Sequence, residues 1–526
     1  MGDPRNKKRF VRVLPVVLLL TAGVILLILG IILIPVFNLI VKEELNTMIP
    51  MSNTSSTLST WKDPGDSVNM NMKFYFFDLT NPSEVAEGKK PYVIQRGPYT
   101  YKEIKVKKNV TFDTEAHTAT YVEPRTLVFD RSLSVGDEND TFITINVPLV
   151  AVVTMIQSIP AAEMVLSGLI DFGLIKDEQL FKRLSVYQLI WGYKDPLMEL
   201  LAPLVKAANI SLPVPMDGYF GFLYKKNETD DGVYTVNTGQ AGLNSFMQVQ
   251  EWNHKSTLSF WKTKYCNMIN GTDGTMYHPF IDVKDKLFLF SSDLARSIDV
   301  VFSSKHYLHD VPQYRFKPPA ALFGYPPDNY DNACYCLGDE CPHNGVLNIT
   351  AVQGAPVFVS QPHFLNGKYY EATIGGLHPD EERHNTFIDV EPTTGIVMKG
   401  AKRLQMNLYV KQNAFVWEMS KMRTMLYPLL WLDESATIND KGLSTFKDMF
   451  FNIQQLMYTI SYILIAVSAA IILLTLLFML IKYLGYRNSQ KIDTPFVEDT
   501  APQTSETTPL LNGGLEPRRA SSPINT

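Results

Sequence analysis

The sequence predicts a membrane-anchored, mainly β protein in which two transmembrane helices flank a large ectodomain. Three observations lead to this fold class. An uncharged apolar run stands near each end of the chain. Short segments rich in β-branched and aromatic residues, bounded by turn formers, fill most of the chain between the two runs. No alternation of strands and helices is visible there, so an antiparallel sheet or barrel is favoured over a parallel sheet.

The composition excludes several classes of protein. Of the 526 residues, 46% are hydrophobic and 19% are charged. This is too apolar for a disordered chain and too polar for a protein made only of membrane helices. Asp and Glu number 53 against 48 Lys and Arg, so the chain has no basic excess with which to bind nucleic acid. We therefore expect no nucleic-acid partner.

The first predicted transmembrane helix covers residues 13–41. Its 29 residues contain no charge, and as a helix they would extend about 43 Å, enough to cross a bilayer with some tilt. A cleaved signal peptide is the alternative, but the apolar core of such a peptide has only about 7–15 residues. Residues 1–12, which carry five basic side chains, are predicted to be a cytoplasmic tail.

The second predicted transmembrane helix covers residues 455–484, and Lys482, Arg487 and Lys491 stand at or beyond its end. Both basic flanks therefore lie on the terminal sides of the two helices. The positive-inside rule then places both termini in the cytoplasm, with residues 485–526 as a cytoplasmic tail. Residues 42–454 are predicted to form the lumenal or extracellular domain.

Glycosylation sequons and cysteines agree with this topology. Seven N-x-S/T sequons lie between the two helices and none lies in a tail, at Asn53, Asn109, Asn139, Asn209, Asn227, Asn270 and Asn348. All four cysteines are in the same compartment, at Cys266, Cys334, Cys336 and Cys341. An even number in an oxidising compartment predicts two disulfides, and the spacing matches no common structural zinc site.

One stretch of the ectodomain departs from the β pattern. Residues 148–208 are rich in Leu, Ala, Met, Ile, Lys and Glu, and apolar residues recur at helical spacing. Pro160, Gly173 and the Asp195-Pro196 step divide this stretch into several short helices. We expect it to cover the β domain as a lid or to present a surface for a partner, and these two roles are compatible.

No catalytic motif is present. The sequence contains no G-x-S-x-G elbow, no H-E-x-x-H, no phosphate loop and no G-x-G-x-x-G. The densest polar cluster, HPDEERH at 378–384, has two histidines six residues apart, which do not share one helix face, so a solvated turn is the favoured interpretation. We therefore predict a protein that is not an enzyme and needs no metal or cofactor.

Several longer motifs resemble the class B scavenger receptor family. They occur in the family's order from the first apolar run to the second: FYFFDLTNP (74–82), QRGPYTY (95–101), LIWGYKDP (189–196), YCNMINGTDG (265–274), QPHF (361–364), TFIDVEPTTG (386–395) and AKRLQMNLYV (401–410). The phrase CNMINGTDG and the segment MRTMLYPLLWLDES (422–435) look most like the lysosomal member of the family.

The resemblance implies a specific architecture. It implies a large antiparallel β-barrel ectodomain with an apical helical bundle at about 148–208 and an internal hydrophobic tunnel toward the bilayer. It also implies the disulfide pairs Cys266–Cys334 and Cys336–Cys341. The ligands that it implies are lipids, namely cholesterol, fatty acids, phospholipid and lipoproteins. Charged residues on the apex could capture them, and the candidates are Lys176, Lys182 and Arg183.

The C-terminal tail contains a candidate sorting signal. ETTPLLNG (506–513) fits the acidic dileucine pattern, with Glu506, Leu510 and Leu511 as its residues. Such a signal would bind clathrin adaptor complexes and direct the protein to the lysosomal or late endosomal membrane. If the two leucines are incidental, the protein stays at the plasma membrane.

Three functions are open at this point. The first is a lysosomal or endosomal protein that binds lipids and transfers them through the ectodomain to the bilayer. The second is a cell-surface scavenger or lipoprotein receptor that mediates ligand uptake. The third is a receptor that carries a lysosomal hydrolase, although residues 148–180 contain no histidine with which to release such cargo in acid. A homo-oligomer is compatible with each of the three.

Overall fold

The computed structural model describes residues 4–156, 164, 168, 179–207, 217–338 and 341–492. The chain divides into two units. One unit joins Met1–Ile34 to Thr459–Thr526, and the other spans Pro35–Tyr458. The first contains most of two long helices, and the second contains every strand that the described residues form.

The two long helices carry the apolar runs. α1 spans Pro4–Met48 and α12 spans Asn452–Ile492, and both are long and apolar enough to cross a membrane. Within their unit they approach closely at two glycines. A methyl group added at Gly23 would lie 2.9 Å from Ile472, and one added at Gly30 would lie 2.8 Å from Ile465. Small residues that let two backbones approach are typical of packed membrane helices.

The main sheet of the ectodomain has eleven strands, and all its strand pairs are antiparallel. Its hydrogen-bonded order is β12-β13-β14-β17-β18-β19-β1-β2-β5, with β16 also paired to β18 and β15 paired to β16. The strands are β1 (Val68–Leu79), β2 (Val93–Lys105), β5 (Arg125–Phe129), β12 (Lys286–Ser291), β13 (Arg296–Leu308), β14 (Val311–Lys317), β15 (Val346–Asn348), β16 (Val357–Ser360), β17 (Phe387–Val390), β18 (Val397–Val410) and β19 (Met425–Ile438).

The predicted antiparallel architecture is confirmed, but the sheet is open. Among the described strands, β12 and β5 stand at the two ends of the hydrogen-bonded order and do not pair with each other. The closed barrel implied by the resemblance is therefore wrong at the level of backbone pairing. Side chains from the turn after β12 and from the start of β5 instead meet in one ionic network, which is described with the site.

The central strand β18 is long, since its 14 residues extend about 45 Å, and its two ends lie in different apolar clusters. At its start, Met398 is buried with Leu443 and Phe446 of α11 (Asp440–Phe446). At its end, Val410 is buried in a different cluster with residues of α4 (Val147–Ile156). The ladder to β19 shifts register at Asn407, which faces Pro428, because proline has no N–H to donate.

Smaller sheets and short helices complete the ectodomain. A four-stranded sheet has the order β11-β10-β4-β3. The pairs β6-β7 and β8-β9 each form a two-stranded sheet. These strands are β3 (Lys108–Asp113), β4 (Thr118–Val122), β6 (Thr141–Ile145), β7 (Phe181–Ser185), β8 (Tyr193–Lys194), β9 (Tyr219–Phe220), β10 (Val233–Asn237) and β11 (Val249–Trp252). The remaining α-helices are α2 (Ser56–Lys62), α3 (Pro82–Ala86), α6 (Val186–Trp191), α7 (Pro196–Ala207), α8 (Thr350–Gln353), α9 (Lys368–Glu371) and α10 (Glu381–His384). Short 3-10 helices lie at Arg131–Leu133, Leu243–Ser245, Ala320–Phe323, Tyr330–Tyr335, Pro362–Phe364 and Trp417–Met419. A π-helical turn covers Lys447–Phe451.

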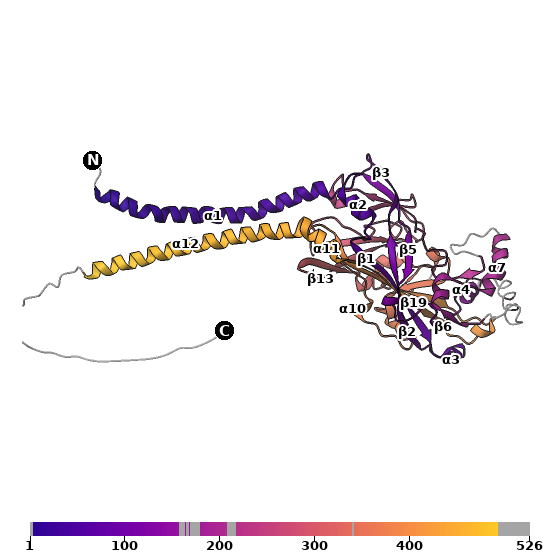
Figure 1. Ribbon diagram of the computed structural model, residues 1–526. Coiled ribbons are helices and arrows are strands. Elements are labelled where there is room, and N and C mark those ends of the chain that lie inside the picture. Colours follow the sequence, from indigo (N-terminus) through magenta and orange to yellow (C-terminus); the bar gives the residue numbers. More distant parts are fainter. Residues whose placement is uncertain are drawn as a thin grey trace, which may run out of the picture. The chain divides into compact units, whose positions relative to one another are not determined.

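The stretch predicted to be helical is mixed in its described part. It contains α4, α6 and α7, but β7 lies between α4 and α6 and pairs antiparallel with β6. Periodicity missed this strand because β7 has only five residues and is followed at once by the capping box of Ser185 and Gln188 that starts α6. Figure 1 shows α4 and α7 near one end of the ectodomain, and α2 and β3 in another part of it.

Candidate functional site

A layer of charged side chains lies on one face of the main sheet. Lys402 of β18 and Glu434 of β19 are cross-strand partners, and Lys402 Nζ is 2.6 Å from Glu434 Oε2. Lys105, at the end of β2, places its Nζ 2.5 Å from the other oxygen of Glu434 and 3.2 Å from Glu103. Side chains alternate between the faces of a strand, so Glu103 and Lys105 project from the same face of β2. The central strands thus present alternating charges to one another.

The same layer connects the two edges of the open sheet. Asp293, in the turn between β12 and β13, accepts a hydrogen bond of 2.8 Å from Lys402 Nζ. Arg125, the first residue of β5, has Nη1 3.7 Å from Glu103. The neighbouring Ser292 donates to Asp231, which precedes β10 of the four-stranded sheet. The charged layer therefore lies between the main sheet and the four-stranded sheet.

Aromatic side chains border the charged layer on both sides. On the face of the main sheet that carries Glu434, the next residues along the strands form an apolar cluster with Phe74, Phe76, Tyr99 and Tyr101. On the other side, the Lys107 ammonium lies 4.9 Å from the Trp61 ring and 5.4 Å from the Tyr121 ring. The cluster around Trp61 and Tyr121 also contains Tyr234 and Phe246. An ionic layer therefore separates two large apolar clusters.

Burial and charge compete in this layer, and charge prevails at Glu434. Burial opposes ionisation of Glu434, but Lys105, Lys402 and Arg125 outweigh it and hold its pKa well below the usual value. Lys402 likewise lowers the pKa of Asp293, against burial. At Glu103 burial prevails and raises the pKa, although Lys105 and Arg125 oppose it. Glu434 and Asp293 therefore stay ionised in acid, whereas Glu103 takes up a proton more readily.

Water reaches this layer although it lies between two sheets. The side chains of Asp293 and Lys402 are 47% and 33% accessible to solvent. Fully packed interiors leave almost no accessible surface on such groups. Solvent therefore reaches the part of the charged layer that Asp293 and Lys402 form.

The predicted ligand-capture residues at the apex have different environments. Lys176 lies outside the described residues. Lys182 is only 13% exposed, and its Nζ pairs at 2.7 Å with Asp195, whose side chain is fully buried. The Lys182 charge thus already neutralises a buried carboxylate that also caps the first turn of α7, and its role in ligand capture stays a prediction. Arg183, the next residue of β7, is exposed.

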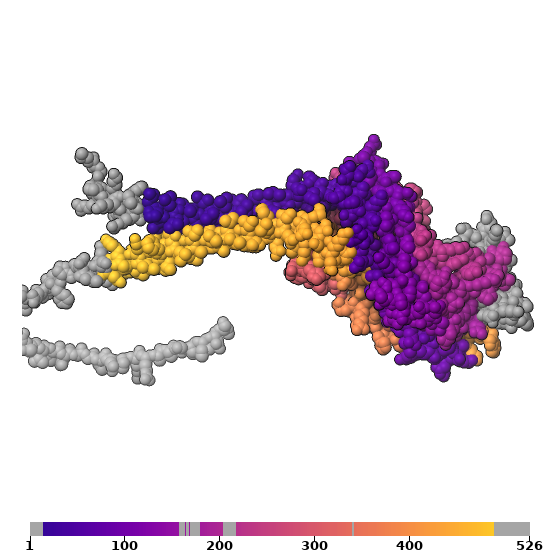
Figure 2. Space-filling model, viewed as in Figure 1, coloured from indigo at the N-terminus to yellow at the C-terminus, as the bar shows by residue number. Residues whose placement is uncertain are grey.

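An aromatic loop at the α4 end of β18 escaped the sequence analysis. Between β18 and β19, Phe415 is 52% exposed and Trp417 is 74% exposed. Val416 and Met419 are buried in the cluster that contains α4, and Asn413 accepts hydrogen bonds from the backbone N–H groups of Phe415 and Val416. The loop is therefore held in place while two aromatic rings face solvent. Magenta segments that include α4 and α7 cover this end of the ectodomain in Figure 2.

The 378–384 cluster is exposed at His378 and at its charged residues, as predicted for a solvated turn, but not at His384. His384 is buried, and its ring stacks on the buried His363 with a centroid separation of 4.4 Å. Burial lowers the pKa of His384 to about 4 and that of His363 to about 3. Asp380 at the start of α10 does face solvent and caps the helix. Among the described residues, no group of three or more His, Cys, Asp or Glu side chains could hold a metal ion.

The remaining predicted residues divide between described and undescribed segments. The structure joins Cys266 to Cys334 and Cys336 to Cys341, which are the pairs that the resemblance implies. Five sequon asparagines are exposed, namely Asn53, Asn109, Asn139, Asn227 and Asn270, and Asn348 is half-buried in β15. Asn209 lies outside the described residues, as do the sorting-signal residues Glu506, Leu510 and Leu511.

Comparison with known proteins identifies the family. The model of the CD36 family matches residues 21–479. The chain belongs to the CD36 family. Lysosome membrane protein 2 of Mus musculus is 36% identical over 437 residues, which cover 82% of this chain and 88% of the relative, and the Homo sapiens protein gives the same values. Scavenger receptor class B member 1 of Rattus norvegicus is 31% identical over 466 residues, 87% of this chain and 88% of the relative.

These relatives confirm the family that the motifs predicted. Both names describe membrane proteins or receptors, and neither describes an enzyme. The two apolar terminal helices fit a two-pass membrane protein of this CD36 family.

Proposed function

We propose that this CD36-family protein is a lysosomal or endosomal membrane receptor that binds lipids and passes them through its ectodomain to the bilayer without covalent chemistry. The observation that carries the proposal is the charged layer itself, which solvent reaches at Asp293 and Lys402 and which has an aromatic cluster on each side. Sterols, fatty acids, phospholipids and lipoprotein lipids are the substrates of this proposal.

A protected route would lower the cost of moving such molecules. Exposing apolar surface to water costs about 25 cal/mol per Å², which makes free transfer of a lipid through water slow. The aromatic rings would cover the apolar part of a lipid, and the paired charges of Lys402 and Glu434 would contact its polar end. The tunnel that the resemblance implies would then run past the charged layer.

The aromatic loop would provide the first contact with a lipid surface. Phe415 and Trp417 project from a fixed loop, and Lys411 and Arg423 in the same segment are exposed. Aromatic rings favour the boundary between lipid and water, and nearby cations favour anionic headgroups. Contact of this loop with a membrane or a lipoprotein surface would bring lipid to the α4 end of the ectodomain.

The lysosomal location rests on the relatives and on the tail. Lysosome membrane protein 2 is named for its location, and Glu506, Leu510 and Leu511 form a pattern that clathrin adaptor complexes bind. Surface labelling of intact cells tests this part. Little wild-type protein at the surface and strong accumulation of a Leu510→Ala/Leu511→Ala variant would support it. Abundant surface protein in both would favour a cell-surface scavenger receptor, as in the name of the other relative.

Reversible blocking at Asp293 tests lipid transfer. All four cysteines are in disulfides, so a single introduced cysteine can be labelled alone. We expect a bulky thiosulfonate on Asp293→Cys to slow uptake of a labelled sterol or fatty acid into cells that carry the full chain. The same label on Tyr307→Cys, at an exposed site of β13, serves as the control. Equal uptake by the labelled and unlabelled Asp293→Cys protein would overturn the proposed route.

A further inference from the structure

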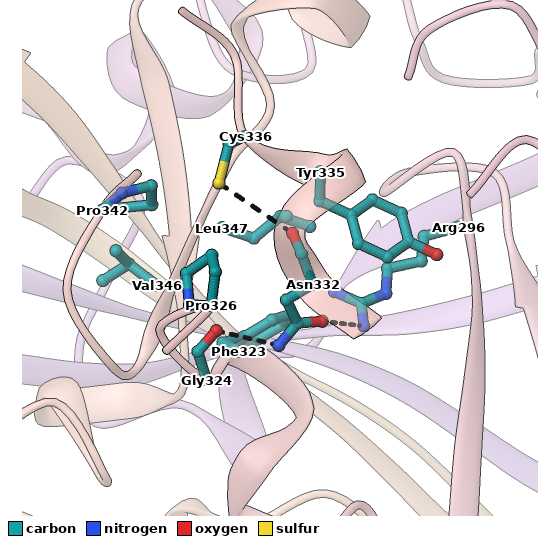
Figure 3. A pocket seen from close by; sticks show the side chains of 10 residues that line it. All are labelled: Arg296, Phe323, Gly324, Pro326, Asn332, Tyr335, Cys336, Pro342, Val346 and Leu347. Carbon is teal, nitrogen blue, oxygen red and sulfur yellow. Dashed lines mark hydrogen bonds between the residues drawn. The ribbon is translucent and has the colours of Figure 1, made fainter. Parts of the chain in front are cut away.

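A small pocket lies next to the disulfides, away from the charged layer. Its volume is about 20 Å³, and Arg296, Asn332, Tyr335 and Cys336 are among the residues that line it. Arg296 opens β13, and the other three belong to or follow the 3-10 turn Tyr330–Tyr335. Figure 3 shows the Arg296 guanidinium beside the Tyr335 ring and the Asn332 side chain.

The guanidinium of Arg296 is buried without a counterion. Arg296 is 7% exposed, and its Nη2 donates one hydrogen bond of 2.9 Å to Asn332 Oδ1. Its Nε and Nη1 have no hydrogen-bond partner. Among the residues that the structure describes, no carboxylate lies within ion-pair distance of Arg296, and burial lowers its pKa although Tyr335 and the more distant Asp299 oppose this. A buried charge in this condition is costly unless another group compensates it.

Aromatic rings compensate only part of this charge. The guanidinium carbon lies 3.9 Å from the Tyr335 ring centroid and 5.9 Å from that of Phe323. Such contacts stabilise a cation, but they accept no hydrogen bond in the plane of the guanidinium. The Nε and Nη1 groups of Arg296 therefore still lack a hydrogen-bond acceptor.

The Asn332 side chain offers no second acceptor to these donors. Asn332 Nδ2 donates to the carbonyl oxygens of Ala321 and Gly324, which fixes the amide so that only its Oδ1 faces Arg296. Pro326 and Val346 are apolar parts of the lining. The only formal charge that the described lining residues bring to the pocket is therefore positive.

We propose that this pocket binds one small monovalent anion, chloride in physiological solution, with Arg296 Nε and Nη1 as its donors. The charge of the site selects an anion over water. The small volume of about 20 Å³ favours an ion about the size of one water molecule over larger anions. This inference does not depend on lipid transfer and can fail or hold separately from it.

The disulfides hold the site together. Asn332 and Tyr335 lie on the turn that carries Cys334, and Cys334 is bonded to Cys266, which lies in the loop after Trp261. Cys336 ends the same turn and is bonded to Cys341. The turn therefore cannot swing away from Arg296 while both bonds are intact. Anion binding should accordingly need the oxidised protein.

Thermal unfolding of the full chain in detergent tests the site. Sodium chloride is compared with sodium gluconate at equal ionic strength, and sodium phosphate serves as the large-anion control. We expect chloride to raise Tm in a saturable way, by about 3 °C at one hundred times its dissociation constant, and phosphate to have no such effect. Absence of a chloride-specific rise in Tm, or an equal rise with phosphate, would overturn the proposal.

Variants of two lining residues make the test specific. Arg296→Met removes the charge, so its Tm should be independent of chloride and, in gluconate, no lower than that of the wild type. Asn332→Asp supplies a carboxylate to Arg296 and should also abolish the chloride dependence, although it loses the two hydrogen bonds that Asn332 Nδ2 donates to Ala321 and Gly324. A chloride effect that persists in Arg296→Met would place the anion elsewhere. If Arg296→Met does not fold, two other results test the site. One is the chloride dependence of Asn332→Asp, and the other is a crystal soaked in bromide. Absence of anomalous bromide density at Arg296 in that crystal would refute the site.

The acidic residues of the undescribed segment provide one more control. If Asp339 or Glu340 neutralises Arg296, chloride should stabilise the Asp339→Asn/Glu340→Gln variant but not the wild type. That outcome would overturn the proposal. Equal chloride dependence in the wild type and in this variant would support it.

Discussion

Two buried histidines should make the ectodomain less stable in acid. The pKa of His384 is lowered to about 4 and that of His363 to about 3, chiefly by burial. An unfolded histidine has a pKa of about 6.5, so below that pH the unfolded chain binds protons that the folded chain excludes. The stability is therefore complete above pH 6.5 and is lost as the pH falls from 6.5 toward the folded values.

The size of this effect follows from the two pKa shifts. At pH 5 each histidine lowers the free energy of unfolding by about 2 kcal/mol, and the pair lowers it by about 4 kcal/mol. For a folded unit of the length of Pro35–Tyr458, the entropy of unfolding is roughly 0.9 kcal/mol per degree. Between pH 7.5 and pH 5 the pair should therefore lower Tm by about 4 °C.

A His384→Asn variant isolates one half of this effect. The asparagine oxygen can accept the hydrogen bond that His384 Nδ1 now accepts from the Asp380 N–H at 2.9 Å, but it does not titrate. Scanning fluorimetry of the full chain at pH 7.5 and pH 5 should show a fall in Tm that is smaller by about 2 °C than in the wild type. His309→Asn makes the same substitution at an exposed histidine and is the control. Asparagine tolerates the positive φ of that position. An identical fall in the wild type and in His384→Asn would refute the reasoning.

Three further changes test other parts of the structure. Asp195→Asn leaves Lys182 without its buried carboxylate and should destabilise the protein by about 3–5 kcal/mol, seen as a lower Tm that Lys182→Met partly restores in the double variant. Asn227→Gln and Thr229→Ala should remove the same glycan in a gel-mobility assay. Asn227→Gln should lower Tm more than Thr229→Ala does, because the Asn227 oxygen accepts a hydrogen bond of 2.8 Å from a backbone N–H of β5, whereas Thr229 loses only an exposed hydrogen bond to the Lys226 carbonyl. Trp417→Ser should change stability by less than about 0.5 kcal/mol and yet weaken flotation with anionic vesicles; unchanged flotation would exclude the aromatic loop as a lipid contact.

The features that sequence could predict are local ones. An apolar run of membrane length, a string of β-branched residues or a sequon is complete within a few tens of residues. The two membrane helices and the antiparallel sheet followed from such patterns. The open edge between β5 and β12 did not, because which strands pair is decided by contacts between segments far apart in the chain.

The charged layer and the histidine pair could not be predicted for the same reason. Lys105 and Glu434 are 329 residues apart in sequence, and each alone resembles an ordinary surface charge. His384 stands among acidic residues that suggest solvent, but it is buried by the His363 and Trp431 rings, which come from distant segments. The buried partner of Lys182 could not be predicted either, since Asp195 lies 13 residues further along the chain and nothing local marks the pair.

The packed pair α1 and α12 has a consequence for how this protein can be shed from a membrane. Each end of the ectodomain continues into a helix long and apolar enough to span the bilayer, and the two helices contact each other at Gly23 and Gly30. A protease that cuts the ectodomain once leaves both fragments embedded. Release of a soluble fragment would need two cuts, one near each helix, so a single cleavage would alter the receptor in place instead of discarding it.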